Sequence, residues 1–168
     1  MTVEKRPVTE SDRDFLFALY ASTRAAELAM VPWDENQKRA FLQSQFAAQA
    51  QGYRQTHPDA THEILLNSGV DAGRLYTSRD AQRIHILDIT IAPWFRNAGI
   101  GTRALHDVIE EADRGQVAVS IYVEDFNPSR RLFERLGFRV ARQDGFMLFL
   151  RRDPPGSDSS PAAEPAGG

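Results

Sequence analysis

The stretch Asp88-Ile-Thr-Ile-Ala-Pro-Trp-Phe-Arg-Asn-Ala-Gly-Ile-Gly-Thr102 decides the fold of this 168-residue chain. Residues 83–92 are β-branched and mostly apolar, which favours a central strand, and Pro93 ends that strand. A helix is predicted from about Gly99 onward, and its first amide N–H groups lack partners within the helix. Because Gly99 and Gly101 have no Cβ, a diphosphate can approach this backbone closely. The stretch therefore predicts an anion-binding turn, with a tight turn and close helix–sheet packing as the alternative.

Hydrophobic periodicity and turn residues predict the elements around this unit. We expect strands at residues 2–9, 63–67, 74–79, 117–123, 138–142 and 146–151, with helices starting at Ser11, running from Asp34 to about Gln51, spanning 99–114 and spanning 127–137. This order of elements predicts one mixed α/β (α+β) domain over residues 1–152. Residues 153–168 are rich in Pro, Gly, Ser and Ala, and we expect this tail to be disordered.

The composition excludes several classes of function. The net charge is −3, and the charges within residues 1–152 cancel, which argues against duplex nucleic acid as a partner. There is no cysteine, so a Cys-ligated zinc and an acyl-cysteine intermediate are excluded. His57 and His62 without further ligands do not make a metal site, and we predict none. No apolar run is long enough to span a membrane, and we expect a cytoplasmic protein whose oligomeric state, a homodimer included, stays open.

One interpretation of the glycines is a dinucleotide site. Gly99-x-Gly101-x-x-Ala104 matches the dinucleotide-binding fingerprint, and Glu124 lies near the position of the ribose-binding acid. That fingerprint normally follows its strand directly, whereas residues 93–98 intervene here. It also opens a run of parallel strands, and few strands follow it in this chain. An NAD-binding oxidoreductase is therefore the weaker alternative.

Two further motifs carry a resemblance to a known family. Arg96-x-x-Gly99-x-Gly101 and the downstream stretch 123–138, VEDFNPSRRLFERLGF, resemble in order and spacing the two signature regions of the Gcn5-related N-acetyltransferases, the GNAT family. The resemblance covers residues 84–150. It implies the GNAT fold, in which about four helices flank a central mixed, mostly antiparallel sheet. It also implies acetyl-CoA as acyl donor and a primary amine, on a small molecule, peptide or protein, as acceptor.

The resemblance also implies the residues that hold acetyl-CoA. In this family the central strand splays from its neighbour and leaves backbone groups free for the pantetheine arm. The implied set comprises Ile89, Thr90 and Ile91 on the strand, Arg96, Asn97, Ala98, Gly99, Ile100, Gly101 and Thr102 at the diphosphate, and Asn127, Arg130 and Phe133 downstream. Plain helix capping by Asn127 and a solvated helix face for Arg130 are the alternatives.

Two positions depart from the family pattern. Asn97 stands where a glycine is usual, and asparagine tolerates the left-handed dihedral angles that such a loop needs. Phe133 stands where the family often carries the tyrosine that protonates the departing CoA thiolate. A phenylalanine cannot donate a proton, and general acid catalysis contributes about 10²- to 10⁴-fold. A module that binds acyl-CoA with little or no turnover is therefore the second hypothesis.

Acyl transfer to an amine also needs an oxyanion donor and a base. We expect the backbone N–H of Ile91, on the splayed strand, to meet the thioester oxygen. Asp88 and Glu124 are the main candidate bases, and Glu27 and His85 are further candidates. A structural acid satisfied by an arginine is the alternative for Asp88.

Overall fold

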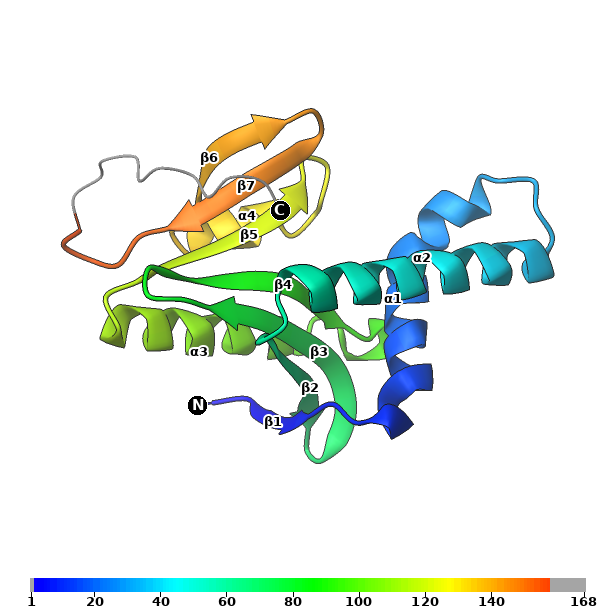
Figure 1. Cartoon of the computed structure of the whole chain (residues 1–168), viewed down its shortest axis with the longest axis horizontal. Coiled ribbons are helices and arrows are strands. Elements are labelled where there is room, and N and C mark those ends of the chain that lie inside the picture. Colours follow the sequence, from blue (N-terminus) through cyan, green and yellow to red (C-terminus); the bar gives the residue numbers. More distant parts are fainter. Residues whose placement is uncertain (1, 158–168) are drawn as a thin grey trace.

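A computed structural model describes residues 2–157 and contains one mixed sheet with helices on both faces (Figure 1). The strands are β1 (Glu4–Pro7), β2 (Thr61–Asn67), β3 (Val70–Arg79), β4 (Arg83–Ile91), β5 (Ala118–Glu124), β6 (Arg139–Asp144) and β7 (Met147–Arg152), and the helices are α1 (Arg13–Ala29), α2 (Glu35–Thr56), α3 (Ile100–Arg114) and α4 (Arg130–Arg135). The sequence of strands and helices predicted above is confirmed.

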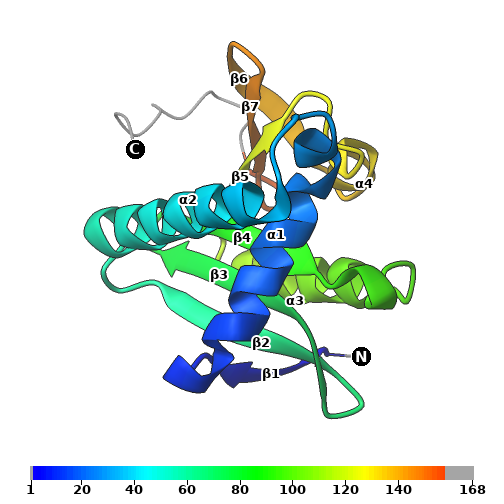
Figure 2. The same ribbon diagram turned by 90° about the vertical axis from the view of Figure 1, so that its right-hand side faces the viewer.

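The seven strands form one sheet in the order β1-β2-β3-β4-β5-β7-β6. Only β4 and β5 run parallel among the described strands; every other neighbouring pair is antiparallel. A doubly wound parallel sheet, which the dinucleotide fingerprint requires, is therefore not the fold. Figure 2 shows α1 and α2 on one side of the sheet and α3 on the other.

The core forms mainly between the sheet and α3. This helix buries one apolar stripe with helical spacing, as the sequence predicts: Ile100, Ala104, Leu105, Val108, Ile109 and Ala112. On the opposite face, α1 packs Leu16 and Leu19 against Ile64 of β2. Helix α2 contributes far less, since Leu42 is its buried residue. As a result α2 lies over the sheet without closing off the surface beneath it.

Element boundaries differ from the prediction by a few residues, most clearly at α2, at the turn between β2 and β3, and at α4. Helix α2 starts after Asp34, whose carboxylate accepts the Gln37 backbone N–H at 2.8 Å, but it continues to Thr56. The predicted hairpin loop shortens to a two-residue turn, because Ser68 (φ 50°) and Gly69 (φ 80°) both adopt positive φ. Helix α4 begins only at Arg130, after a turn.

The segment after β7 is described as far as residue 157. Asp153 accepts hydrogen bonds from Arg139 and Arg151, each at 2.9 Å, and Pro154 is buried. The remainder of the predicted disordered tail, residues 158–168, lies outside the described residues. The domain boundary at residue 152 stays a prediction.

Strands β4 and β5 pair over only half their length. Their register runs from Arg83 opposite Ala118 to Ile86 opposite Ile121 and goes no further. Beyond that point Leu87 forms a bulge against β3, because Tyr76 pairs with Asp88 while the next residue, Thr77, pairs with Ile86. The strands therefore diverge at Leu87, and one edge of the second half of β4 is free of a strand partner.

Candidate active site

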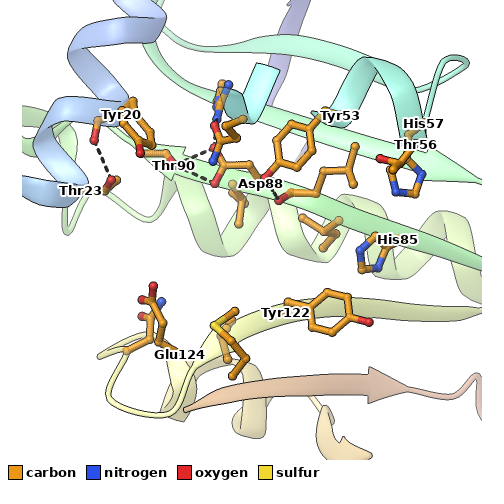
Figure 3. A pocket seen from close by; sticks show the side chains of 18 of the residues that line it. Tyr20, Thr23, Tyr53, Thr56, His57, His85, Asp88, Thr90, Tyr122 and Glu124 are labelled. Carbon is orange, nitrogen blue, oxygen red and sulfur yellow. Dashed lines mark hydrogen bonds and ion pairs between the residues drawn. The ribbon is translucent and has the colours of Figure 1, made fainter. Parts of the chain in front are cut away.

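A cleft of about 640 Å³ lies where β4 and β5 diverge, on the face covered by α1 and α2. Figure 3 shows Glu124 at one end of this cleft, Asp88 and Thr90 along β4, and His57 and His85 at the other end. Its walls are Tyr20, Thr23, Arg24 and Glu27 of α1, Gln49, Tyr53 and Thr56 of α2 with the adjoining His57, Arg74 of β3, Arg83 and residues 85–90 of β4, Tyr122, Val123 and Glu124 of β5, and Asn127 and Met147.

The free edge of β4 presents backbone groups to the gap. The Ala92 N–H donates to the Ala72 carbonyl at 2.8 Å, so this residue points toward β3. Backbone groups of successive strand residues point to opposite sides, and therefore those of Ile89 and Ile91 point away from β3 into the gap. Ile89 and Thr90 line the cleft, whereas Ile91 lies beyond it, nearer to α3.

A tyrosine of α2 holds the bulge in place. The Tyr53 hydroxyl donates to the Leu87 carbonyl at 3.0 Å, which satisfies a backbone group that the bulge leaves without a strand partner. Burial raises the pKa of Tyr53 to about 12, so the hydroxyl keeps its proton at neutral pH. Sequence reasoning missed Tyr53, because nothing local distinguishes it within the polar pattern of α2.

The loop from β4 to α3 has the backbone conformation that an anion cradle requires. Asn97 (φ 66°) and Gly99 (φ 80°) are both left-handed, so the expectation that asparagine can replace glycine here is confirmed. No side chain caps the first turn of α3, so the amides of Ile100, Gly101 and Thr102 lack helix partners. A Cβ added to Gly99 would meet no atom within 4 Å, so the space beside this residue is open. Free amides and open space at the start of α3 are compatible with a diphosphate.

Gly101 lies where the first turn of α3 contacts β4. A Cβ there would lie 3.4 Å from the Ile91 side chain, which is an ordinary van der Waals distance. Packing against β4 therefore does not by itself require glycine at this position, and the close helix–sheet approach stays an alternative. Arg103 reaches back to this loop, with Nε 3.3 Å from the Gly99 carbonyl. Both Arg96 and Ala98 lie in the same loop, in the order that the motif predicts.

The candidate acids have different partners. Asp88 forms an ion pair with the buried Arg74 and also accepts the Thr90 hydroxyl at 3.0 Å. Glu27 pairs with Arg24 at 3.2 Å. Glu124 lines the cleft without an ion pair among residues 2–157. The structure thus brings all three acids to one cleft. Of the three, Glu124 is the one whose carboxylate forms no ion pair within residues 2–157.

The two histidines of the cleft are neutral at pH 7. His57 and His85 stack with their ring centroids 6.0 Å apart, and Nδ1 of each contacts a serine hydroxyl, Ser78 at 3.2 Å and Ser120 at 2.8 Å. Burial, with the neighbouring charge of Arg83, lowers the pKa of His57 and lowers that of His85 to about 4.

The downstream candidates are placed differently from one another. Asn127 lines the cleft, and its Oδ1 accepts the Ser129 backbone N–H at 2.8 Å within the turn before α4. The N-cap residue of α4 is Ser129, so the expectation that Asn127 caps this helix is wrong. Arg130 pairs with Glu134 along the exposed face of α4. Phe133 is 3% exposed and packs edge-on against the ring of Phe138 in the core. Phe133 therefore does not line the cleft.

The described residues contain no group of three or more His, Asp or Glu side chains placed to hold a metal ion. None of the helices within residues 2–157 has the length and apolar character needed to span a membrane.

Comparison with known proteins agrees with this architecture. Residues 27–138 match the model of the acetyltransferase (GNAT) family. No protein of curated function matches the sequence significantly.

Solved structures share the fold at low sequence identity. A PaiA N-acetyltransferase from Thermoplasma acidophilum, in complex with coenzyme A, matches with a TM-score of 0.68 and 15% identity over 91% of this chain and 99% of its own. An acetyltransferase from Thermus thermophilus matches with a TM-score of 0.62 and 18% identity over 91% of this chain and 97% of its own. A GNAT family acetyltransferase from Elizabethkingia anophelis, with acetyl-CoA bound, has a TM-score of 0.54 and 18% identity over 90% and 98% of the two chains.

The family match covers more than half of the sequence, and the mostly antiparallel sheet with its single parallel pair is the fold of these acetyltransferases. The resemblance inferred from the two motifs is confirmed: this chain belongs to the GNAT family of acetyltransferases.

Proposed function

We propose that this protein transfers an acetyl group from acetyl-CoA to a primary amine. The observation that carries the proposal is the divergence of β4 from β5 at Leu87. From that point β4 leads continuously from the cleft to the loop with free amides at the start of α3. Acetyl-CoA supplies the activated acyl group. In this proposal residues 96–102 bind its diphosphate, and the free strand edge at residues 89–91 binds its pantetheine arm.

The oxyanion donor in this proposal is the backbone N–H of Ile89. Ile91 is the donor expected from the sequence, but the strands diverge at Leu87 and Ile91 does not line the cleft. Both amides point into the gap, and that of Ile89 is the one beside the cleft. A backbone N–H held by a sheet needs no reorganisation as charge develops on the thioester oxygen. Ile91 then contacts the arm farther out.

The proposed base is Glu124, acting directly or through a water molecule. An amine acceptor is largely protonated at pH 7, so a proton must leave before or during attack. Asp88 is held by Arg74 and Thr90, and its proposed role is to keep Arg74 in place rather than to accept a proton. Tyr122 lines the cleft and takes the place of the missing family tyrosine as donor to the CoA thiolate.

The test measures binding and turnover separately. Acetyl-CoA should raise the melting temperature and NAD should not, because only a ligand of the native state stabilises it. CoA release against a panel of amines should then fall about 100-fold in Glu124→Gln, the scale of lost general base catalysis. Glu110→Gln, on the exposed face of α3, is the matched control and should retain full activity. Absence of CoA release with every amine would contradict the proposal.

A second candidate is a domain that binds acyl-CoA without appreciable turnover. It is favoured by one observation, the placement of Phe133 in the core where a hydroxyl donor is usual. Phe133→Tyr and Tyr122→Phe distinguish the two. If Tyr122 is the donor, Tyr122→Phe lowers kcat and Phe133→Tyr leaves it unchanged. If the wild type binds acetyl-CoA with negligible turnover and Phe133→Tyr gains activity, the binding domain is the correct description.

A further inference from the structure

The charges that line the cleft do not all have partners. Asp88 is paired with Arg74, and Glu27 with Arg24. Within the described residues 2–157, Arg83 at the inner end makes no salt bridge with a carboxylate. These ion pairs leave the middle of the cleft neutral. Arg83 and His85 contact the same Ser120 hydroxyl, so the positive charge lies at the inner end with His57 and His85, opposite to Glu124 (Figure 3).

Arg83 is held in position by groups that do not neutralise it. Its Nη1 donates to the Ser120 hydroxyl at 3.2 Å, and its guanidinium lies 5.5 Å from the centre of the Phe149 ring. The nearby carboxylate of Asp80 accepts two backbone N–H groups, those of Gln82 at 2.8 Å and of Arg83 at 3.0 Å. Burial lowers the pKa of Arg83 in spite of the charge of Asp80, which forms no ion pair with it among the described residues; a bound anion would offset this cost of burial.

Neutral hydrogen-bonding groups surround this guanidinium. The rings of His57 and His85 line the same end of the cleft, and their Nδ1 atoms already contact serine hydroxyls. Nε2 is therefore the ring atom of each that is left to meet a ligand. Thr56 adds a hydroxyl group beside them. A fixed guanidinium beside hydrogen-bonding side chains suits a carboxylate, because Arg binds carboxylates with two parallel N–H groups.

The spacing along β4 gives the length of the ligand. Ser120, which contacts the Arg83 guanidinium, lies opposite His85 in the strand register. Ile89, whose N–H is proposed to bind the thioester oxygen, is four residues farther along β4, and one of these residues lies in the bulge. At a rise of about 3.3 Å per residue over three to four residues, the two points are roughly 10–13 Å apart. An extended peptide of three or four residues spans this distance.

We propose that the inner end of the cleft, at Arg83, His57 and His85, binds a carboxylate of the acceptor. The acceptor is then an amine whose own carboxylate lies about 10–13 Å from the nitrogen, the span of a tripeptide or tetrapeptide. The proposal rests on the proposed acetyltransferase function and specifies its substrate class. It disfavours polyamines, which would place a second cation beside Arg83.

The wild-type enzyme provides the first test. Triglycine and triglycinamide have the same backbone, and only the first ends in a carboxylate. With acetyl-CoA fixed, kcat/KM for triglycine should exceed that for triglycinamide roughly 10- to 100-fold, the contribution of a charge-assisted hydrogen bond. Free glycine, which cannot span the distance, should be a poor acceptor. Equal rates for triglycine and triglycinamide would overturn the proposal while leaving the acetyltransferase function intact.

Variants of Arg83 provide the second test. Arg83→Gln should raise the KM for triglycine about 10-fold or more with little change for triglycinamide, and Arg83→Lys should recover part of the loss. Arg114→Gln removes one exposed charge from α3 and is the matched control. If no amine is acetylated, the proposed function fails. NMR titration with triglycine then still decides the subsite: shifts lost in Arg83→Gln support it, and shifts that are absent or equal in both proteins refute it.

Discussion

Gly99→Ala tests the diphosphate site with one methyl group. Gly99 has φ 80°, and a Cβ added there meets no atom within 4 Å. The cost to the free protein is therefore backbone strain alone, about 1–2 kcal/mol. For a chain of this length, that strain should lower the melting temperature by roughly 2–8 °C.

The chain offers a closely matched control for this strain. Gly69, in the turn between β2 and β3, also has φ 80° and open space around its Cα. Gly69→Ala should therefore lower the melting temperature about as much as Gly99→Ala. The two variants differ in one respect, since Gly99 is the N-cap residue of α3 and directly precedes its free amides, whereas Gly69 lies in a hairpin turn.

The difference should appear when acetyl-CoA is added. At 100 times its Kd, the ligand stabilises the wild type by about 2.7 kcal/mol, a rise of roughly 5–11 °C in melting temperature. If the methyl group weakens binding about 10-fold, the same concentration stabilises Gly99→Ala by only about 1.4 kcal/mol, half the rise. Gly69→Ala should show the full rise. A full rise in Gly99→Ala as well would refute the assignment of the diphosphate to this loop.

Three further variants test other parts of the structure. Tyr53→Phe leaves the Leu87 carbonyl without its donor, and it should cost about 1–3 kcal/mol in urea denaturation and lower kcat more than acetyl-CoA affinity. Burial lowers the pKa of His62 in the folded protein to about 4, whereas in the unfolded chain it is about 6.5. Between pH 6.5 and 4 the unfolded chain therefore binds a proton that the folded protein does not, and the free energy of unfolding falls as pH falls. In His62→Phe this fall should be smaller over the same range. The hydrogen bonds from Arg6 lower the pKa of Asp12 to about 2, so this carboxylate stabilises the folded protein above pH 4. As pH falls from 4 toward 2, the free energy of unfolding should fall more in the wild type than in Asp12→Asn. An equal fall in the two proteins would contradict this role of Asp12.

Local patterns predicted most of the fold and the cofactor loop. The order of elements follows from hydrophobic periodicity, turn residues and caps such as Asp34, all of which act over a few residues. The backbone conformation of the loop at Asn97 and Gly99 was predictable for the same reason. Positive φ angles and free helix amides are local properties of a strand–loop–helix unit.

The acceptor side of the cleft was not predictable in this way. Tyr53 meets Leu87 across 34 positions of sequence, and Arg83 meets Ser120 across 37. Asp88 was predicted as a candidate base, but its partner Arg74 comes from the neighbouring strand and changes its role. No periodicity within a single element records such pairings, since they depend on sheet register.

By itself, then, the sequence determined the elements, the conformation of the loop before α3 and the family, because these depend on spacing along the chain. Only the tertiary structure decided where β4 leaves β5 and which charges of the cleft form ion pairs within residues 2–157. The physical reason is that ion pairing and burial depend on which strand and helix lie opposite each side chain. Arg74 and Arg24 lie beside carboxylates, whereas Arg83 forms no ion pair among the described residues.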